Sequence, residues 1–118
     1  MFGGANLENA YLKGANLKGA YLRGAILKNS RLDSTYLENA EMVGADLQNA
    51  KLWNSNLTGA KLQNSNLRNA EFNEKTVLFN VNLYTNSIQT GDGSLFDPDL
   101  LLNINRYLMK QGTVVNAQ

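Results

Sequence analysis

The sequence predicts an all-β solenoid, a parallel β-helix whose C-terminal end is closed by a short capping α-helix. Two observations carry this prediction. A small residue recurs at every fifth position from Ala5, and a large apolar residue follows it two positions later. Beyond residue 90, the pattern changes to one that is typical of a capped helix.

The repeat runs through fourteen consecutive copies without a slip. Its large apolar residues are Leu7, Leu12, Leu17, Leu22, Leu27, Leu32, Leu37, Met42, Leu47, Leu52, Leu57, Leu62, Leu67 and Phe72. On an α-helix, a step of five residues turns by about 500°, so these residues would form no apolar stripe. In a continuous strand, an odd spacing would place alternate members on opposite faces. The chain must therefore bend once in every repeat.

The last position of each repeat holds the residue types that a bend needs. From residue 9 to residue 74, it is asparagine seven times and glycine five times. Both residue types tolerate positive φ, which tight turns require. Each repeat is then a short extended piece followed by a corner, and four corners close a coil of 20 residues. The small and large residues both point inward, because a narrow coil has no room for two large groups.

Runs such as ANLENAYLKGANLKGAYLRGA and ADLQNAKLWNSNLTGAKLQNSNL resemble the pentapeptide-repeat family, with its A(D/N)Lxx consensus. The resemblance covers about three quarters of the chain. It implies a right-handed quadrilateral β-helix. It also implies a place among proteins that are abundant in cyanobacteria, and some members mimic DNA and bind a topoisomerase, which confers quinolone resistance.

Charged residues provide an internal test of the coil, because residues 20 apart should be neighbours on its surface. Only Arg31 and Lys51 then bring like charges together. Five pairs unite opposite charges: Glu8–Lys28, Lys13–Asp33, Lys18–Glu38, Glu41–Lys61 and Lys51–Glu71. Each exposed pair contributes only about 0–1 kcal/mol, so these pairs tune the register and leucine burial drives folding.

The β-helix is predicted to occupy residues 1–90, about four coils, with a one-residue slip near 74–75. The large residues resume at Leu78 instead of position 77, and we expect a bulge at that corner. Leu78 then joins the column of Leu57. Residues 91–118 are predicted to form a loop, a capping helix over about 97–111 and a short tail.

The predicted helix begins at Asp97 as N-cap and ends before Gly112. One face should cover the open end of the solenoid, since solenoid ends need caps. Leu102 and Met109 lie on the opposite face. They indicate either a homodimer through the C-terminal helix or apolar residues scattered on the surface, which are common.

A second candidate contact surface lies on the repeats. Tyr11, Arg31, Lys51 and Trp53 fall on one side of the solenoid, together with Lys13. Tryptophan, tyrosine and arginine are typical anchors of protein interfaces. The alternative is a purely local role, in which Tyr11 stacks on Arg31 through a cation–π contact and Trp53 covers its neighbours.

No catalytic, cofactor or metal site is predicted. Histidine and cysteine are absent, and the acidic residues of the repeats occupy outward positions. The aspartates between residues 92 and 99 lack the spacing of an EF-hand loop. The net charge of +1 and the absence of a long apolar run favour neither nucleic acid nor a membrane as a partner.

The sequence thus predicts a non-enzymatic structural or protein-interaction module with an unknown protein partner. The alternative is a DNA-mimic binder of a topoisomerase, which the charge disfavours because residues 1–74 hold eight basic and seven acidic residues. The repeats begin within a few residues of Met1, so we expect no signal peptide and a cytoplasmic location.

Overall fold

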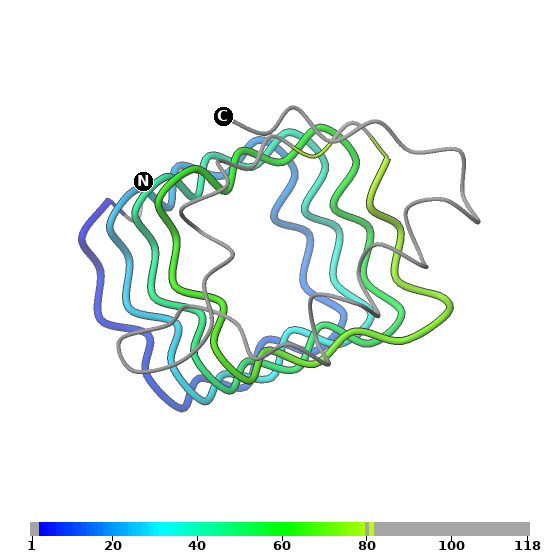
Figure 1. Cartoon of the computed structure of the whole chain (residues 1–118), viewed down its shortest axis with the longest axis horizontal. Helices are drawn as coiled ribbons and strands as arrows, with labels where there is room; N and C mark the ends of the chain where they lie inside the picture. The colour runs from blue at the N-terminus through cyan, green and yellow to red at the C-terminus, as the bar shows by residue number, and fades with distance from the viewer. Residues whose placement is uncertain (1–2, 80, 82–118) are drawn as a thin grey trace.

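The computed structural model describes residues 3–79 and 81. These residues wind as stacked coils around a four-sided outline (Figure 1). Neighbouring coils pair in parallel through one residue on each side. The bridges are Asn6–Ile26, Tyr11–Arg31, Asn16–Tyr36, Tyr21–Glu41, Ile26–Asp46, Arg31–Lys51, Tyr36–Asn56, Glu41–Lys61, Asp46–Asn66, Lys51–Glu71 and Asn56–Val77. The expected 20-residue coil is confirmed by every bridge except the last.

Each side of a coil contributes a single bridge residue, so the described residues contain neither a longer strand nor a helix. Ile26 shows the pattern, since its N–H donates to the carbonyl of Ala5 at 2.8 Å and its carbonyl accepts from Leu7 at 2.7 Å. Both bonds point to the same neighbouring coil. A corner follows at once, so a five-residue repeat leaves no room for a longer ladder.

The corners are tight turns that depend on the last residue of each repeat. At the corner of Glu8 and Asn9, the carbonyl of Leu7 accepts a hydrogen bond from the N–H of Ala10 at 3.0 Å. Asn9 is the third residue of this turn and has a φ of 63°, and Ser34 has 59° at an equivalent corner. A turn with positive φ at its third residue favours glycine and asparagine. This requirement explains why the last position of most repeats is asparagine or glycine.

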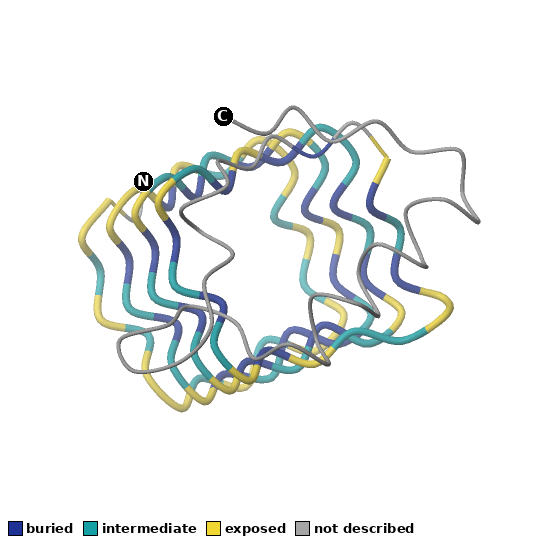
Figure 2. Ribbon diagram, viewed as in Figure 1, coloured by how far each residue is buried: buried dark blue, intermediate teal, exposed yellow. Residues whose placement is uncertain are grey.

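The buried residues of successive coils line up in columns (Figure 2), and together they form one apolar core. Leu27, Leu37 and Leu47 are each 0 % exposed, as are the alanines at 25, 40 and 50. In the first coil, at one end of the stack, Leu7 and Leu12 are only half-buried. The core therefore depends on coils above and below each leucine.

Hydroxyl residues in the small inward positions differ in their hydrogen bonding. Thr35, Ser55 and Ser65 each donate to the carbonyl three residues earlier, at 2.6, 2.6 and 2.7 Å. Ser30 is equally buried, but its Oγ has no hydrogen-bond partner. A buried polar group without a partner destabilises the folded state.

Ser30→Ala is therefore expected to raise the free energy of unfolding by about 1 kcal/mol, because it removes the unsatisfied hydroxyl. Ser65→Ala is the matched control, since it removes a hydroxyl that does form a hydrogen bond. Urea unfolding of both variants measures the difference. Equal losses of stability in the two variants would contradict the role assigned to the Ser30 hydroxyl.

The register changes by one residue after Phe72. Asn56 pairs with Val77 rather than with residue 76, and Leu57 donates to the carbonyl of Val77 at 2.8 Å. Leu78, 3 % exposed, thereby reaches the core. The extra residue enlarges the corner between Asn73 and the next small residue.

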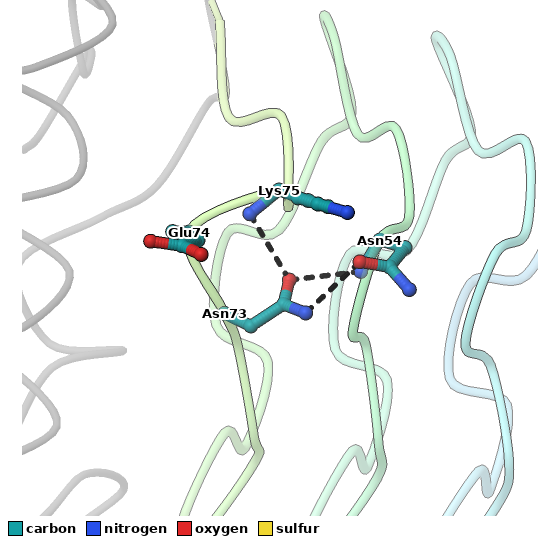
Figure 3. A pocket seen from close by; sticks show the side chains of 4 residues that line it. All are labelled: Asn54, Asn73, Glu74 and Lys75. Carbon is teal, nitrogen blue, oxygen red and sulfur yellow. Dashed lines mark hydrogen bonds between the residues drawn. The ribbon is translucent and has the colours of Figure 1, made fainter.

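The side chain of Asn73 compensates for the extra residue (Figure 3). In a regular corner, the N–H of Ser34 donates to the backbone carbonyl of Trp53, one coil further, at 2.8 Å. The equivalent N–H of Asn54 donates instead to Oδ1 of Asn73, at 2.9 Å. The backbone carbonyl of Asn73 accepts from Thr76 at 3.0 Å. A side-chain oxygen thus replaces the displaced backbone acceptor.

The predicted boundary between residues 90 and 91 lies outside the described residues. So do the capping helix over 97–111 and its apolar pair Leu102 and Met109. These features, and the homodimer that they suggest, stay predictions.

Candidate protein-contact face

One side of the solenoid gathers aromatic and charged side chains from four successive coils. We call it the aromatic–cation face. It comprises Tyr11, Lys13, Arg31, Asp33, Lys51, Trp53 and Glu71. The bridges place four of these residues in one column, in the order Tyr11, Arg31, Lys51, Glu71. The coil therefore brings together the four contact candidates of the repeats, which lie between positions 11 and 53 of the sequence.

The aromatic rings and cations of this face stack on one another. The guanidinium carbon of Arg31 lies 5.8 Å from the ring centre of Tyr11 and 5.8 Å from that of Trp53. Nζ of Lys51 lies 5.5 Å from the ring centre of Trp53. The ring of Trp53 thus contacts both Arg31 and Lys51, the like-charged pair. Each exposed cation–π contact contributes about 0.5–1 kcal/mol.

Arg31 is held in place by a carboxylate within its own repeat. Its Nε donates to Oδ1 of Asp33 at 3.1 Å and its Nη2 donates to Oδ2 at 3.2 Å. Asp33 is only 4 % exposed, and Nζ of Lys13 lies 4.0 Å from its Oδ2. Such a two-point contact fixes the plane of the guanidinium group. Asp33 therefore positions Arg31 between the two rings.

Opposing influences act on the carboxyl group of Asp33. Burial acts to raise its pKa, as expected for a desolvated acid. The hydrogen bonds from Arg31 and from its own backbone N–H, with the charges of Arg31 and Lys13, outweigh burial and lower the pKa below the usual 3.8. The hydrogen bond to Asp33 in turn raises the pKa of Arg31. The folded state thus favours the charged pair.

The depressed pKa of Asp33 predicts an acid-sensitive contribution to stability. A carboxyl with a lower pKa in the folded state stabilises the fold above its unfolded pKa, usually 3.8, and loses this effect as the pH falls through the folded value. Asp33→Asn removes the titration at nearly constant shape. The difference in unfolding free energy between wild type and variant should shrink as the pH falls below about 4. A pH-independent difference would contradict this assignment.

Four of the five predicted ion pairs between coils form. Their N–O distances are 4.0 Å for Lys13–Asp33, 3.2 Å for Lys18–Glu38, 3.4 Å for Lys51–Glu71 and 3.3 Å for Lys61–Glu41. In the described part of the chain, Glu8 and Lys28 do not form the fifth. The charge pattern of the sequence therefore reported the register correctly.

A hollow of about 500 Å³ lies at the enlarged corner (Figure 3). It is lined by Asn54, Asn73, Glu74 and Lys75. Asn54 directly follows Trp53 in the sequence. Nδ2 of Asn73 donates to Oδ1 of Asn54 at 3.0 Å, which ties the two coils together beside the hollow.

Sequence reasoning did not identify two residues of this region. The 20-residue coil pairs Asp33 with Lys13 alone, although residues 31 and 33 flank an inward leucine and must share the outer face. That alternation was the available signal. The bridging role of Asn73 had no such signal, because it depends on the local path of the extra residue.

The described residues show no cluster of three or more acidic groups that could hold a metal ion. Among these residues, we find no helix with the length and apolar character of a membrane span.

The solved structures that resemble this chain include two from cyanobacteria. A pentapeptide repeat protein from Cyanothece 51142 is 44 % identical, with 66 % of this chain and 56 % of that chain covered and a TM-score of 0.56. This chain thus spans little more than half of that protein. A pentapeptide repeat protein from Nostoc Pcc 7120 is 25 % identical over 99 % of this chain and 84 % of that chain, with a TM-score of 0.68.

A plasmid-mediated fluoroquinolone resistance protein is a more distant neighbour. It is 18 % identical, with 70 % of this chain and 56 % of that chain covered, and its TM-score of 0.34 is too low to support an inference about function. No curated protein matches this chain. The comparisons indicate no catalytic family.

The family model for pentapeptide repeats matches residues 2–39 and 40–74, in eight copies. These ranges make up more than half of the chain and include all the coils that carry the aromatic–cation face. The chain therefore belongs to the pentapeptide repeat family, whose fold is a right-handed β-helical solenoid.

Proposed function

We propose that this protein is a non-enzymatic structural or protein-interaction module that contacts a partner protein through its aromatic–cation face. The observation that supports the proposal most is the exposure of stacked anchor residues on a rigid surface. Tyr11 is 69 % exposed, although it stacks on a guanidinium group that two hydrogen bonds fix. Anchors that are rigid before binding lose little conformational entropy when they bind.

The scaffold suits this role. Each coil is tied to the next by backbone hydrogen bonds around its whole perimeter, so the outward side chains have fixed spacings. The columns below them are filled with leucine and alanine, which leaves the outer surface as the part available for recognition. Broad, regular surfaces of this kind are typical of solenoid proteins that bind other proteins.

DNA mimicry with topoisomerase binding receives less support. A DNA mimic needs a strongly acidic surface to imitate the charge density of phosphates. Residues 1–74 carry eight basic and seven acidic residues, and several of these pair with each other between coils. The near-neutral surface thus favours a specific protein contact over an imitation of nucleic acid.

Affinity capture from the native cell tests the proposal. Trp53→Ala is expected to lose a partner that the wild type retains, because it removes the ring shared by Arg31 and Lys51. The matched control is Tyr36→Ala on the adjacent side, where Tyr36 is 50 % exposed and lies under Lys18 at 5.6 Å. Retention of every partner by Trp53→Ala would remove the aromatic–cation face as the binding surface.

A further inference from the structure

We propose that the aromatic–cation face binds an acidic helical segment of a partner protein, with carboxylates three or four residues apart. This inference rests on the proposed function and names the chemistry of the partner. It depends on which charges of the face are accessible, on their spacing, and on the position of the exposed ring.

The accessible charge of the face is positive. The side chains of Lys13, Arg31 and Lys51 are 51 %, 37 % and 33 % exposed, whereas that of Asp33 is only 6 % exposed. Asp33 therefore accepts hydrogen bonds from Arg31 while its own carboxylate is almost fully covered, so it adds almost no negative charge to the accessible surface. A binding partner meets three cations with one accessible carboxylate, Glu71, at the far end of the column.

Arg31 and Lys51 also keep capacity for a ligand. A guanidinium group has five N–H donors, and Asp33 uses those on Nε and Nη2 of Arg31. The ammonium group of Lys51 has three donors, and Glu71 lies 3.4 Å from its nitrogen. Further carboxylates can thus be accepted without breaking the contacts that position these two residues.

The spacing of the cations favours a helix over a strand. Arg31 and Lys51 are bridge partners on adjacent coils, so their backbones are about 4.8 Å apart. Residues three or four apart on a helix have Cβ atoms about 5–6 Å apart. Residues on the same face of a strand repeat at about 6.7 Å. Glutamates one helical turn apart therefore match the coil spacing more closely.

The ends of the column differ, which gives the bound segment a direction. Tyr11 presents its ring at one end and offers an apolar contact beside Lys13. Glu71, with a side chain 47 % exposed, lies at the other end and repels a carboxylate placed there. The segment that fits this column has an apolar residue over Tyr11 and carboxylates over Arg31 and Lys51. Near Glu71 it has a neutral or basic residue.

The test uses the 118-residue chain and two synthetic helical peptides without tryptophan. One is alanine-rich with glutamate pairs at positions i and i+4, and the other carries glutamine at the same positions. Trp53 is the single tryptophan of the chain, so its fluorescence reports on this face alone. We expect a saturable change in fluorescence with the glutamate peptide. The glutamine peptide should bind at least about threefold more weakly, and high salt should weaken the binding of the glutamate peptide.

Lys51→Gln and Lys61→Gln provide the matched pair of variants. Each lysine pairs with a glutamate one coil away, at 3.4 and 3.3 Å, but Lys61 belongs to a different column. Lys51→Gln should weaken binding of the glutamate peptide by about threefold or more, and Lys61→Gln by less than about twofold. Equal affinities for the two peptides, or equal effects of the two substitutions, would overturn the proposal.

A third peptide tests the helix. It places the same number of glutamates at alternate positions of a threonine- and valine-rich sequence that disfavours helix formation. Tighter binding of this peptide than of the helical one would overturn the helical part of the inference. If neither acidic peptide binds while Trp53→Ala still loses its partner in the capture experiment, the proposed function holds and the acidic-helix inference fails.

Discussion

Leu47→Ala is expected to lower the free energy of unfolding by about 3–5 kcal/mol, the upper part of the range for buried leucines. Leu47 is 0 % exposed in the middle of its column. The cost of such a cavity depends on how far the surroundings can collapse. Here the coils on both sides are fixed, because Leu27 donates to the carbonyl of Asp46 at 2.7 Å and Leu47 donates to that of Asn66 at 2.7 Å.

Leu7→Ala is the matched control, since Leu7 belongs to the same column but lies half-buried in the first coil. Leu7→Ala should lower the free energy of unfolding by clearly less than Leu47→Ala. It leaves little enclosed volume, and much of the removed side-chain surface is already in contact with water. Chemical denaturation monitored by circular dichroism gives both values. Equal losses would show that stability is not concentrated in the interior columns.

Asn73→Ala is expected to destabilise the protein by about 1–3 kcal/mol. The substitution removes Oδ1, which accepts from the N–H of Asn54 and the N–H of Lys75 at 2.9 and 3.2 Å. It also removes the donor to Oδ1 of Asn54. In the regular corners from Gly4 to Asn49, and again at Gly59, a backbone carbonyl one coil away accepts this N–H.

A double-mutant cycle separates the role of Asn73 from a general loss of polarity. Replacing Glu74 and Lys75 with a single glycine restores the five-residue period and allows the positive φ of a regular corner. The backbone carbonyl of residue 73 can then accept the N–H of Asn54. Asn73→Ala should cost little in this background. An undiminished cost would contradict the role of its side chain as a substitute acceptor.

The repeating part of the structure was predictable because one spacing determines many contacts at once. A period of five residues and a coil of 20 residues predict the inward leucines and the corners at asparagine and glycine. They also predict the neighbours of Lys18 and Lys51. The slip was visible for the same reason, since Leu78 falls out of frame. Single-residue bridges in place of longer strands follow from the proximity of the corners.

Side-chain choices within one repeat were less predictable. Arg31 contacts Asp33 in addition to its neighbours on adjacent coils, and Asn73 turns its amide toward Asn54. Both depend on rotamers and on a local backbone path that the period does not specify. The column order Tyr11, Arg31, Lys51 was predicted from the coil length, but the ring of Trp53 lying near both cations required coordinates.

The proposed function requires that a partner protein binds the side of the solenoid carrying Tyr11, Arg31, Lys51 and Trp53. Photo-crosslinking in the native cell tests it most directly, with benzoylphenylalanine in place of Tyr11 or, as a control, of Tyr36 on the adjacent side. Both tyrosines are exposed, at 69 % and 50 %, and both lie under a cation. We predict a discrete protein adduct from position 11 that Trp53→Ala abolishes, and none from position 36. Adducts of the same protein from both positions, or from position 36 alone, would contradict the claim.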